Sequence, residues 1–329
     1  MHRYFVIPMV AFFGLILLFV IYLQLINDNW KYLAPKPELP DSCNDDKDLE
    51  IVIHEEDKIN GRSFKDRYDA SGFKNQIHAI FLLPCEQKDR KLDVNLNIQS
   101  SLFAINKWFQ NKSLNQKIIF DITTKGNIDT TFLRVNKSMK WFLSSKTKEK
   151  LYDKTDVSEK IENIIKRNQY IFNNYSDKKF IVFFEGWEKR KYLNYDVCGK
   201  SRFGGQVSVY FTSSPFKKYI GNEIILKNKK RIFSCTKNDH LNNINDLKFG
   251  DAEVTMLHEI LHSLGFPANC GKNLDKSKNH VEDSKDDILY RISGNNYLDF
   301  NNDDYYNHKI ENCFDLKNSS YLTSINDNS

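Results

Sequence analysis

The sequence of 329 residues lacks several features, each of which would indicate a particular class of protein. Its six cysteines form no C-x-x-C pair and no cluster, which argues against a structural zinc site made of thiolates. No stripe of lysine and arginine is interleaved with aromatic side chains, and the net charge is only +5, which argues against a nucleic-acid partner. No segment repeats another. A chain of this length can form one large globular domain or two small ones.

An apolar segment near the N-terminus, residues 4–23, contains no charged side chain. As a helix it would be about 30 Å long, enough to cross the hydrocarbon core of a bilayer. The sequence that follows, QLINDNW, has no small residues where a signal peptidase would cut. We therefore expect an uncleaved transmembrane signal anchor over residues 4–26, after a short cytoplasmic end of residues 1–3.

The cysteines favour a location outside the cytoplasm for the rest of the chain. All six follow the apolar segment, at Cys43, Cys85, Cys198, Cys235, Cys270 and Cys313. An even number in an exported domain predicts up to three disulfides, with scattered thiols in a reducing compartment as the alternative. We expect a single-pass membrane protein whose N-terminus is cytoplasmic and whose folded part is periplasmic or extracellular.

Proline spacing and apolar periodicity divide the remainder of the chain. The prolines of residues 33–40 predict a stiff stalk, so we assign residues 27–73 to a stalk or linker and residues 74–329 to the folded domain. Strands are predicted at residues 76–83, 117–121, 131–135, 179–184 and 206–211, and helices at residues 92–109 and 157–172. This alternation predicts an α+β fold in which helices pack on a mixed sheet.

Another amphipathic helix is predicted within residues 250–267, GDAEVTMLHEILHSLGFP. Asp251 can cap the free amides of the first turn. Gly265 occupies the position where a left-handed residue ends a helix. Leucine and isoleucine side chains at helical spacing form a stripe that we expect to be buried.

The same helix carries an H-E-x-x-H motif. His258 and His262 are four residues apart, so both imidazoles project from one face and can bind one metal ion. Glu259 lies beside them and can take a proton from an attacking water that zinc acidifies. Two surface histidines on an ordinary helix are the alternative, but the cap, stripe and glycine around the motif favour the zinc site.

A catalytic zinc site needs a third protein ligand and an open coordination position. The short metzincin motif would place that ligand at residue 268, which is Ala268 here, so the ligand must lie further along the chain. The candidates downstream are His280, Glu282, Asp283 and His308. Glu282 would give a thermolysin-like site. We favour His280, the first histidine after the glycine turn, over a surface role for it, with Asp283 as the alternative ligand.

Four segments after residue 257 carry a resemblance to a known family: HEILHSLGFPANC, NHVEDSKDDILY, LDFNNDDYYNH and CFDLKNSSYL. They resemble a group of secreted, metzincin-like zinc peptidases, whose pattern includes HExxHxxG, His-Val-x-Asp, Asp-Leu-Met-Tyr and Cys-x-Asp-Leu. Upstream, KKFIVFFEG and DVCG resemble the same group. The likeness covers most of residues 76–323.

The resemblance implies a zincin-like catalytic domain with a particular set of site residues. It implies the zinc ligands His258, His262 and His280, the catalytic base Glu259, and disulfides between Cys270 and Cys313 and between Cys198 and Cys235. The chain departs from the family at Leu289, where the family has the methionine of its turn. Leucine is close to methionine in volume, so it can form the same apolar floor beneath the metal.

Two further groups give weaker signals. Tyr290 and Tyr297 follow the turn, and either phenol could donate to an oxyanion, although a core or rim tyrosine is the simpler interpretation. The segment from Asp299 to Asp304 has oxygen ligands at alternating positions, as calcium loops do, but it lacks the glycine and the distal glutamate of an EF-hand. A solvated acidic turn is favoured over a calcium site.

Together these patterns predict a membrane-anchored zinc hydrolase with one catalytic ion, acting as a metalloendopeptidase on protein or peptide substrates. A zinc amidase that cleaves cell-wall or other non-protein amides would use the same helix motif, so it stays open. An inactive zincin-like binding module is the alternative outside enzymes. The intact Glu259 argues against that alternative, because a structural site needs no base.

Overall fold

The computed structural model describes residues 43–67, 72–144, 157–189, 196–213, 224–225, 231–232, 247–291, 294 and 296–325, all of which belong to one compact unit. The predicted cytoplasmic end and the signal anchor, residues 1–26, lie outside the described residues. Among the residues that are described, no helix is both long enough and apolar enough to cross a membrane.

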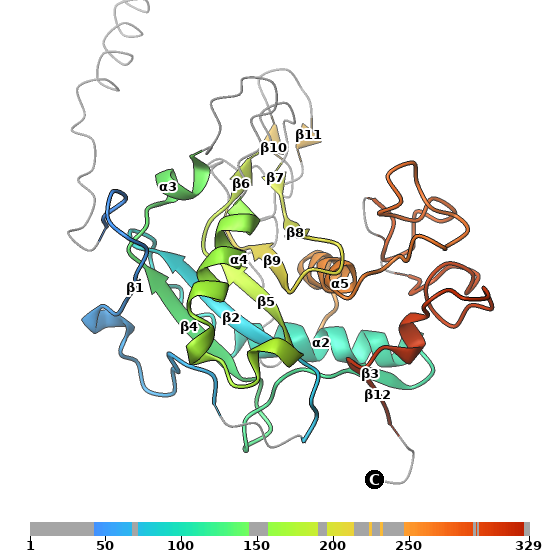
Figure 1. Cartoon of the computed structure of the whole chain (residues 1–329), viewed down its shortest axis with the longest axis horizontal. Helices are drawn as coiled ribbons and strands as arrows, with labels where there is room; N and C mark the ends of the chain where they lie inside the picture. Colours follow the sequence, from blue (N-terminus) through green and yellow to red (C-terminus); the bar gives the residue numbers. More distant parts are fainter. Residues whose placement is uncertain are drawn as a thin grey trace, which may run out of the picture. The chain divides into compact units, whose positions relative to one another are not determined.

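A six-stranded sheet forms the centre of the domain (Figure 1). Its order is β1 (Ile51–Val52), β4 (Thr130–Val135), β2 (Gln76–Pro84), β5 (Lys178–Phe184), β9 (Val207–Phe211) and β8 (Gly199–Ser201). The four inner strands are parallel, and β1 and β8 pair antiparallel at the two edges. The expected mixed sheet is confirmed, and its parallel interior makes the chain a mixed α/β domain.

The other elements are four helices, four 3₁₀ turns and three short strand pairs within the described residues. The helices are α2 (Asn97–Lys112), α3 (Met139–Leu143), α4 (Val157–Arg167) and α5 (Asp251–Ser263), and the turns are η1 (Glu55–Asp57), η2 (Gln169–Ile171), η3 (Tyr175–Asp177) and η5 (Leu316–Asn318). The pairs are β3 (Gln116–Ile118) with β12 (Leu322–Ser324), β6 (Glu188–Lys189) with β7 (Asp196–Val197), and β10 (Ile224–Ile225) with β11 (Arg231–Ile232).

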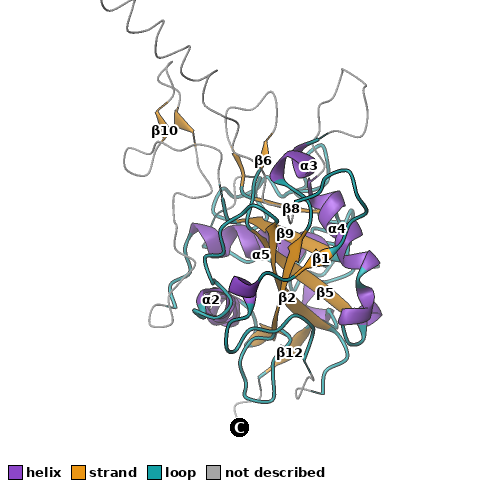
Figure 2. Ribbon diagram, turned by 90° about the vertical axis from the view of Figure 1, so that its left-hand side faces the viewer, coloured by secondary structure: helices purple, strands orange, loops and turns teal. Residues whose placement is uncertain are grey.

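Helices cover both faces of the sheet, so the domain has three layers (Figure 2). Successive residues of a strand point to opposite faces. In β2, Ala79 and Phe81 pack in one core with α2 and α5, while Ile80 and Leu82 pack in a second core with α3 and α4. Burial on both faces favours apolar residues at successive positions, which explains the continuous apolar run AIFLL at residues 79–83 of this strand.

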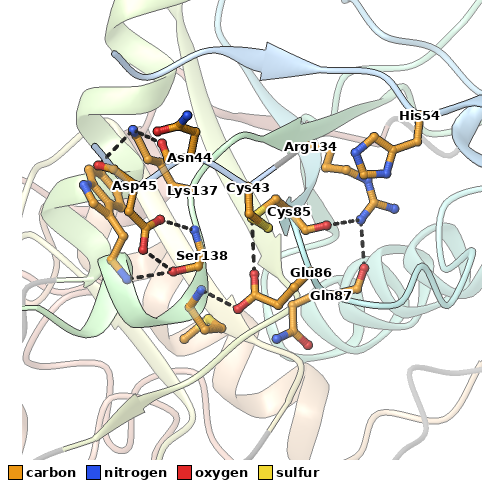
Figure 3. Close-up of a disulfide and its surroundings, with 12 residues drawn as sticks. Cys43, Asn44, Asp45, His54, Cys85, Glu86, Gln87, Arg134, Lys137 and Ser138 are labelled. Carbon is orange, nitrogen blue, oxygen red and sulfur yellow. Dashed lines mark hydrogen bonds between the residues drawn. A yellow bond between two sulfur atoms is a disulfide. The ribbon is translucent and has the colours of Figure 1, made fainter. Parts of the chain in front are cut away.

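Residues 43–67, predicted as part of the stalk, belong to this domain. β1 pairs with β4, and Asp57 is fully buried in an ion pair with Arg134 (Oδ1 to Nη2, 2.7 Å). A disulfide joins Cys43 to Cys85 at the end of β2 (Figure 3). The folded domain therefore begins before residue 51 rather than at residue 74. Ionic contacts hold this segment, so its polar composition gave no sign of burial.

The loop after β4 holds residues 44–47 through hydrogen bonds to backbone and carboxylate oxygens (Figure 3). Lys137 is 2% exposed, and its ammonium donates to the carbonyls of Asn44 (2.7 Å) and Lys47. Ser138 donates to the carboxylate of Asp45 through its hydroxyl (2.5 Å) and its amide (2.8 Å). These bonds replace the apolar packing that a short edge strand cannot provide.

A buried ionic cluster lies at the first residues of β2 and β5. Lys178 donates to Asp66 (2.6 Å) and to Asp121 (2.5 Å), and His78 Nδ1 lies 2.7 Å from Asp121. None of these four side chains is more than 4% exposed. The ammonium of Lys178 is therefore the counter-charge that lets two carboxylates stay buried side by side.

Replacing Lys178 by methionine should destabilise the domain by about 3–5 kcal/mol, because it leaves two buried carboxylates without a cation. Urea unfolding at pH 7 measures the change. Lys166→Met, an exposed lysine of α4, is the matched control and should change the free energy of unfolding by less than about 0.5 kcal/mol. Equal stabilities of the two variants would contradict the role given to Lys178.

Candidate metal centre

Helix α5 begins one residue earlier than its capping pattern suggested. The N-cap is Gly250, whose amide donates to Glu253 Oε2 (3.0 Å), and Asp251 is the first helical residue. Glu253 is 1% exposed, and its other oxygen accepts a hydrogen bond from Ser101 of α2 (2.6 Å). The predicted Asp251 cap is therefore wrong. A buried glutamate one turn into the helix fixes its start and ties it to α2.

The end of α5 follows the predicted glycine stop. Gly265 has φ of +92°, its amide donates to the carbonyl of His262 (2.9 Å), and the amide of Phe266 donates to Leu261 (3.0 Å). These two bonds are the Schellman arrangement, which needs a left-handed residue at the glycine position. The turn folds the chain back so that the carbonyl of Phe266 lies beside the last turn of the helix.

Lys179, the second residue of β5, also holds this end of the helix. Its ammonium donates to the carbonyls of Ser263 (2.8 Å), Gly205 (2.8 Å) and Gly204 (3.2 Å). A cation at a helix C-terminus is favoured by the helix dipole. Lys179 thus joins the sheet, the loop between β8 and β9, and the C-terminus of α5.

The structure brings together His258, His262 and His280. The ring centroids lie 4.4 Å apart for His258 and His262, 5.4 Å for His258 and His280, and 5.2 Å for His262 and His280. One ring nitrogen from each lies within 4.8 Å of the others. Three imidazole nitrogens at such separations can surround one metal ion, and a tetrahedral zinc site would keep its fourth position for a water or substrate.

A hydrogen bond at Nδ1 orients each ring. His258 Nδ1 lies 2.7 Å from the carbonyl of Ile288, His262 Nδ1 lies 2.8 Å from that of Phe266, and His280 Nδ1 lies 3.4 Å from Asp275 Oδ2. A carbonyl only accepts, so Nδ1 of His258 and of His262 carries the proton. Their Nε2 atoms then hold the lone pair that a metal needs, which is the usual arrangement around a histidine ligand.

Burial keeps the three imidazoles neutral. Desolvation lowers the pKa of His262 to about 4 and that of His258 well below its usual range, with neighbouring imidazoles acting in the same direction. Desolvation lowers the pKa of His280 as well, opposed by Asp275. At neutral pH no proton competes for these nitrogens. A neutral three-nitrogen donor set of this kind fits zinc.

Glu259 follows His258 on α5 and is 8% exposed. A Cβ atom on Gly199 of β8 would lie 2.5 Å from Glu259 Cγ and 3.1 Å from its Oε1. The absence of a side chain at Gly199 therefore leaves the space that the carboxylate occupies. Ser208 of β9 donates to the backbone carbonyl of Glu259 (3.1 Å), which fixes the helix against the sheet at this residue.

The loop containing Leu289 packs under the first histidine. Leu289 and Ile288 are fully buried, as expected for an apolar residue at position 289. Asp287 anchors the loop by accepting hydrogen bonds from the amides of Leu289 (2.7 Å) and Phe300 (2.9 Å). Burial raises the pKa of Asp287 to about 7, against the opposite effect of those bonds. The carbonyl of Ile288 is thereby held for His258.

The structure does not bring the other ligand candidates to the imidazoles. Asp283 lies with Asp303 and Asp304 in a separate cluster, Glu282 is exposed, and the ring of His308 lies beside the carbonyl of Phe314 (3.4 Å). The position of Asp283 therefore does not support its predicted alternative role as the third ligand of this centre.

Both tyrosines proposed as oxyanion donors stay predictions. Tyr290 is half-buried, and Tyr297 is 41% exposed with its ring packed against Phe300 (centroids 4.9 Å apart). The acidic segment differs from its prediction: Asp299 and Asp304 are 6% and 1% exposed, so a solvated turn is wrong for them.

The disulfide implied between Cys270 and Cys313 is present and closes the segment that contains His280. Cys198 is also disulfide-bonded, and its implied partner Cys235 lies outside the described residues. The bond from Cys43 to Cys85 was not anticipated, because sequence spacing gives no pairing.

Sequence reasoning missed two residues that shape the centre. Asp275 lies five positions before His280 and Gly199 lies on an edge strand, and no local pattern marks either one. Only the folded chain places Asp275 at an imidazole and Gly199 at a carboxylate.

No protein-family profile and no curated protein matches the sequence. Among solved structures, the chain is similar to archaemetzincin from Methanopyrus kandleri, with 10% identity, 69% of this chain and 92% of the other covered, and a TM-score of 0.33. It is also similar to catalytically inactive OgpA from Akkermansia muciniphila, solved with an O-glycopeptide substrate, with 9% identity, 74% and 55% coverage, and a TM-score of 0.32. This chain thus spans about half the length of OgpA. Likenesses of this size decide neither the fold nor the function.

With chelator present to keep the imidazoles free of metal, the stability of the chain should fall as the pH falls from 7 to 5. The unfolded His262 takes a proton near pH 6.5 and the folded one only near 4, so stability present above pH 6.5 is lost on the way down. His262 alone should account for about 2 kcal/mol at pH 5. Urea unfolding of the metal-free chain and of His262→Gln measures it. Parallel pH profiles for the two proteins would contradict the assignment.

Proposed function

We propose that this chain is a zinc-dependent hydrolase, and most specifically a metalloendopeptidase. The observation that supports this best is the meeting of three neutral imidazoles, two of them on the helix that also carries the buried Glu259. A purely structural zinc site has four protein ligands and no need of a base. Three ligands with an adjacent carboxylate are the arrangement of a hydrolytic site.

Each residue of the site would have a separate role in hydrolysis. His258, His262 and His280 would hold the ion, and bound zinc would acidify a water and polarise the scissile carbonyl. Glu259 accepts the proton of the attacking water and delivers it to the leaving amine. Gly199 and the bond from Ser208 keep the carboxylate in place for both transfers.

The substrate we propose is a protein or peptide, with its scissile amide over the imidazole centre. An amide of the cell wall or another non-protein amide is the second candidate, because the same three ligands and base would cleave it. We also propose that residues 4–26 anchor the chain in a membrane with its catalytic domain outside the cytoplasm. The disulfides of the domain support that location.

Replacing Glu259 by glutamine should reduce hydrolysis at least about 100-fold, because the amide cannot take the proton. The zinc content should stay at that of the unchanged chain, since the three imidazoles remain. The measurement pairs kcat/KM on casein-type and cell-wall substrates with metal analysis, and Glu282→Gln, an exposed glutamate nearby, is the control. Full activity of Glu259→Gln would contradict the proposed role of Glu259 as the base. Cleavage of cell-wall material alone by the unchanged chain would favour the amidase over the peptidase.

Replacing Gly199 by alanine tests the placement of Glu259. The added methyl would lie 2.5 Å from Glu259 Cγ, so the carboxylate must move. A shift of about 1 Å at a reacting group costs up to about 100-fold in rate, so kcat should fall by at least about 10-fold with the zinc content retained. Ser201→Ala on the same strand is the control. An unchanged kcat in Gly199→Ala would show that the glycine does not position the base.

A further inference from the structure

A second group of potential metal ligands lies outside the imidazole centre. Asp283, Asp303 and Asp304 each place one carboxylate oxygen within 4.8 Å of the others. They come from two segments, one just after His280 and one in the acidic turn. Clusters of acidic residues are common at protein surfaces and need no ion there. This cluster differs from those because Asp304 is 1% exposed and both carboxylate oxygens of Asp283 are withdrawn from solvent, while Asp303 is 30% exposed.

The carboxylate of Asp283 is the unusual group. The side chain as a whole is half-buried, but each of its two oxygens exposes less than 1 Å². Neither oxygen has a hydrogen-bond partner among the described residues. The amides of Asp283 and Ser284 act on the carboxylate to lower its pKa, but this effect is smaller than that of burial, which raises it. An ionised carboxylate withdrawn from water in this way requires a counter-charge or a proton.

The neighbours of Asp283 supply little of that counter-charge. Asp304 is 1% exposed and accepts hydrogen bonds from the amide of Asn273 (2.6 Å) and from its side chain (3.2 Å), both neutral groups. The ammonium of Lys272 lies 3.9 Å from Asp303 Oδ2, on a side chain that is 61% exposed. Within the described part of the chain, the three carboxylates therefore have one mostly solvated cation, Lys272, as an ion-pair partner.

The acidic turn is built so that these carboxylates point together. Asp299 accepts hydrogen bonds from the amides of Asp304 (3.2 Å), Tyr305 (2.7 Å) and Tyr306 (2.6 Å). The carboxylate of Asp299 is occupied by the backbone and does not belong to the cluster. It fixes the curvature of the turn, which leaves Asp303 and Asp304 facing Asp283.

We propose that Asp283, Asp303 and Asp304 bind a divalent cation, and that the cation is Ca²⁺. All three donors are carboxylate oxygens, the ligands that hard cations prefer. Ligands on opposite sides of Ca²⁺ are about 4.8 Å apart, twice a bond length of about 2.4 Å, so the three oxygens are close enough to share one ion. The ion would join residues 281–283 to residues 303–304.

This site is independent of the imidazole centre. Its ligands are all oxygen, and the centre's are all nitrogen, so the two would hold different metals. His280 precedes Asp283 by three residues, and the cation would hold that stretch of chain against the acidic turn. The competing explanation is a proton on Asp283, since burial raises the pKa of that carboxyl, with Asp304 and Asp303 adding to the effect.

The test is thermal unfolding of the purified full-length chain, freed of Ca²⁺ with a chelator and then titrated with CaCl₂ alone. The melting temperature should rise by about 5 °C at a Ca²⁺ concentration roughly 100 times the Kd. Asp283→Asn and Asp303→Asn should lose that rise. Asp286→Asn, an exposed aspartate of the same segment, should keep it, and so should His262→Ala, because it alters only the imidazole centre.

A second comparison separates the cation from the proton. Without Ca²⁺, Asp283→Asn should be at least as stable as the unchanged chain, because it removes an unpaired buried charge. With Ca²⁺ it should be the less stable of the two. Calorimetric titration should show one Ca²⁺ per chain. No rise in the unchanged chain, or an equal rise in Asp283→Asn, would overturn the proposal and leave the proton as the explanation.

Discussion

The candidate centre depends on the hydrogen bonds that fix Nδ1 of its imidazoles. A histidine can turn about its side-chain bonds, and an H-E-x-x-H sequence alone does not hold two rings toward one point. Here His258 is held by the carbonyl of Ile288 and His262 by that of Phe266. Each acceptor lies in a turn whose own amides are bonded elsewhere. These hydrogen bonds orient the rings toward one point, and preorganised ligands lower the cost of binding a metal.

Those two turns in turn depend on the rest of the domain. Lys179 binds the end of α5 to the first residues of β5, and the Schellman bonds return Phe266 toward the helix. Asp287 fixes the loop of Ile288 from the opposite side. The sheet and the loops after α5 thus act on the same pair of histidines from two directions. A chain that lost either support would keep its motif but lose its geometry.

The parts of this structure that could be predicted are those that short sequence patterns encode. The inner strands carry runs of apolar residues, as burial on both faces favours, and the sequence located them to within about two residues. The helix of His258 was also predicted, because its stripe and Gly265 are local signals. The first residues of the domain were missed, since Asp57 and Arg134 pair over 77 positions and no window of sequence contains both. The roles of Gly199 and Asp275 were missed for the same reason.

The Asp66–Asp121 cluster and the Asp283–Asp303–Asp304 cluster both need a positive charge to balance their carboxylates, but they differ in where that charge is found. Asp66 and Asp121 are buried together and share the ammonium of Lys178, which is 2% exposed and bonded to both. Asp283 has no such partner, and the lysine near its cluster stays largely in solvent. Since carboxylates cannot remain charged and buried without compensation, the first cluster is complete within the described residues and the second is not. The Ca²⁺ proposed for the second cluster would supply the positive charge that Lys178 supplies in the first.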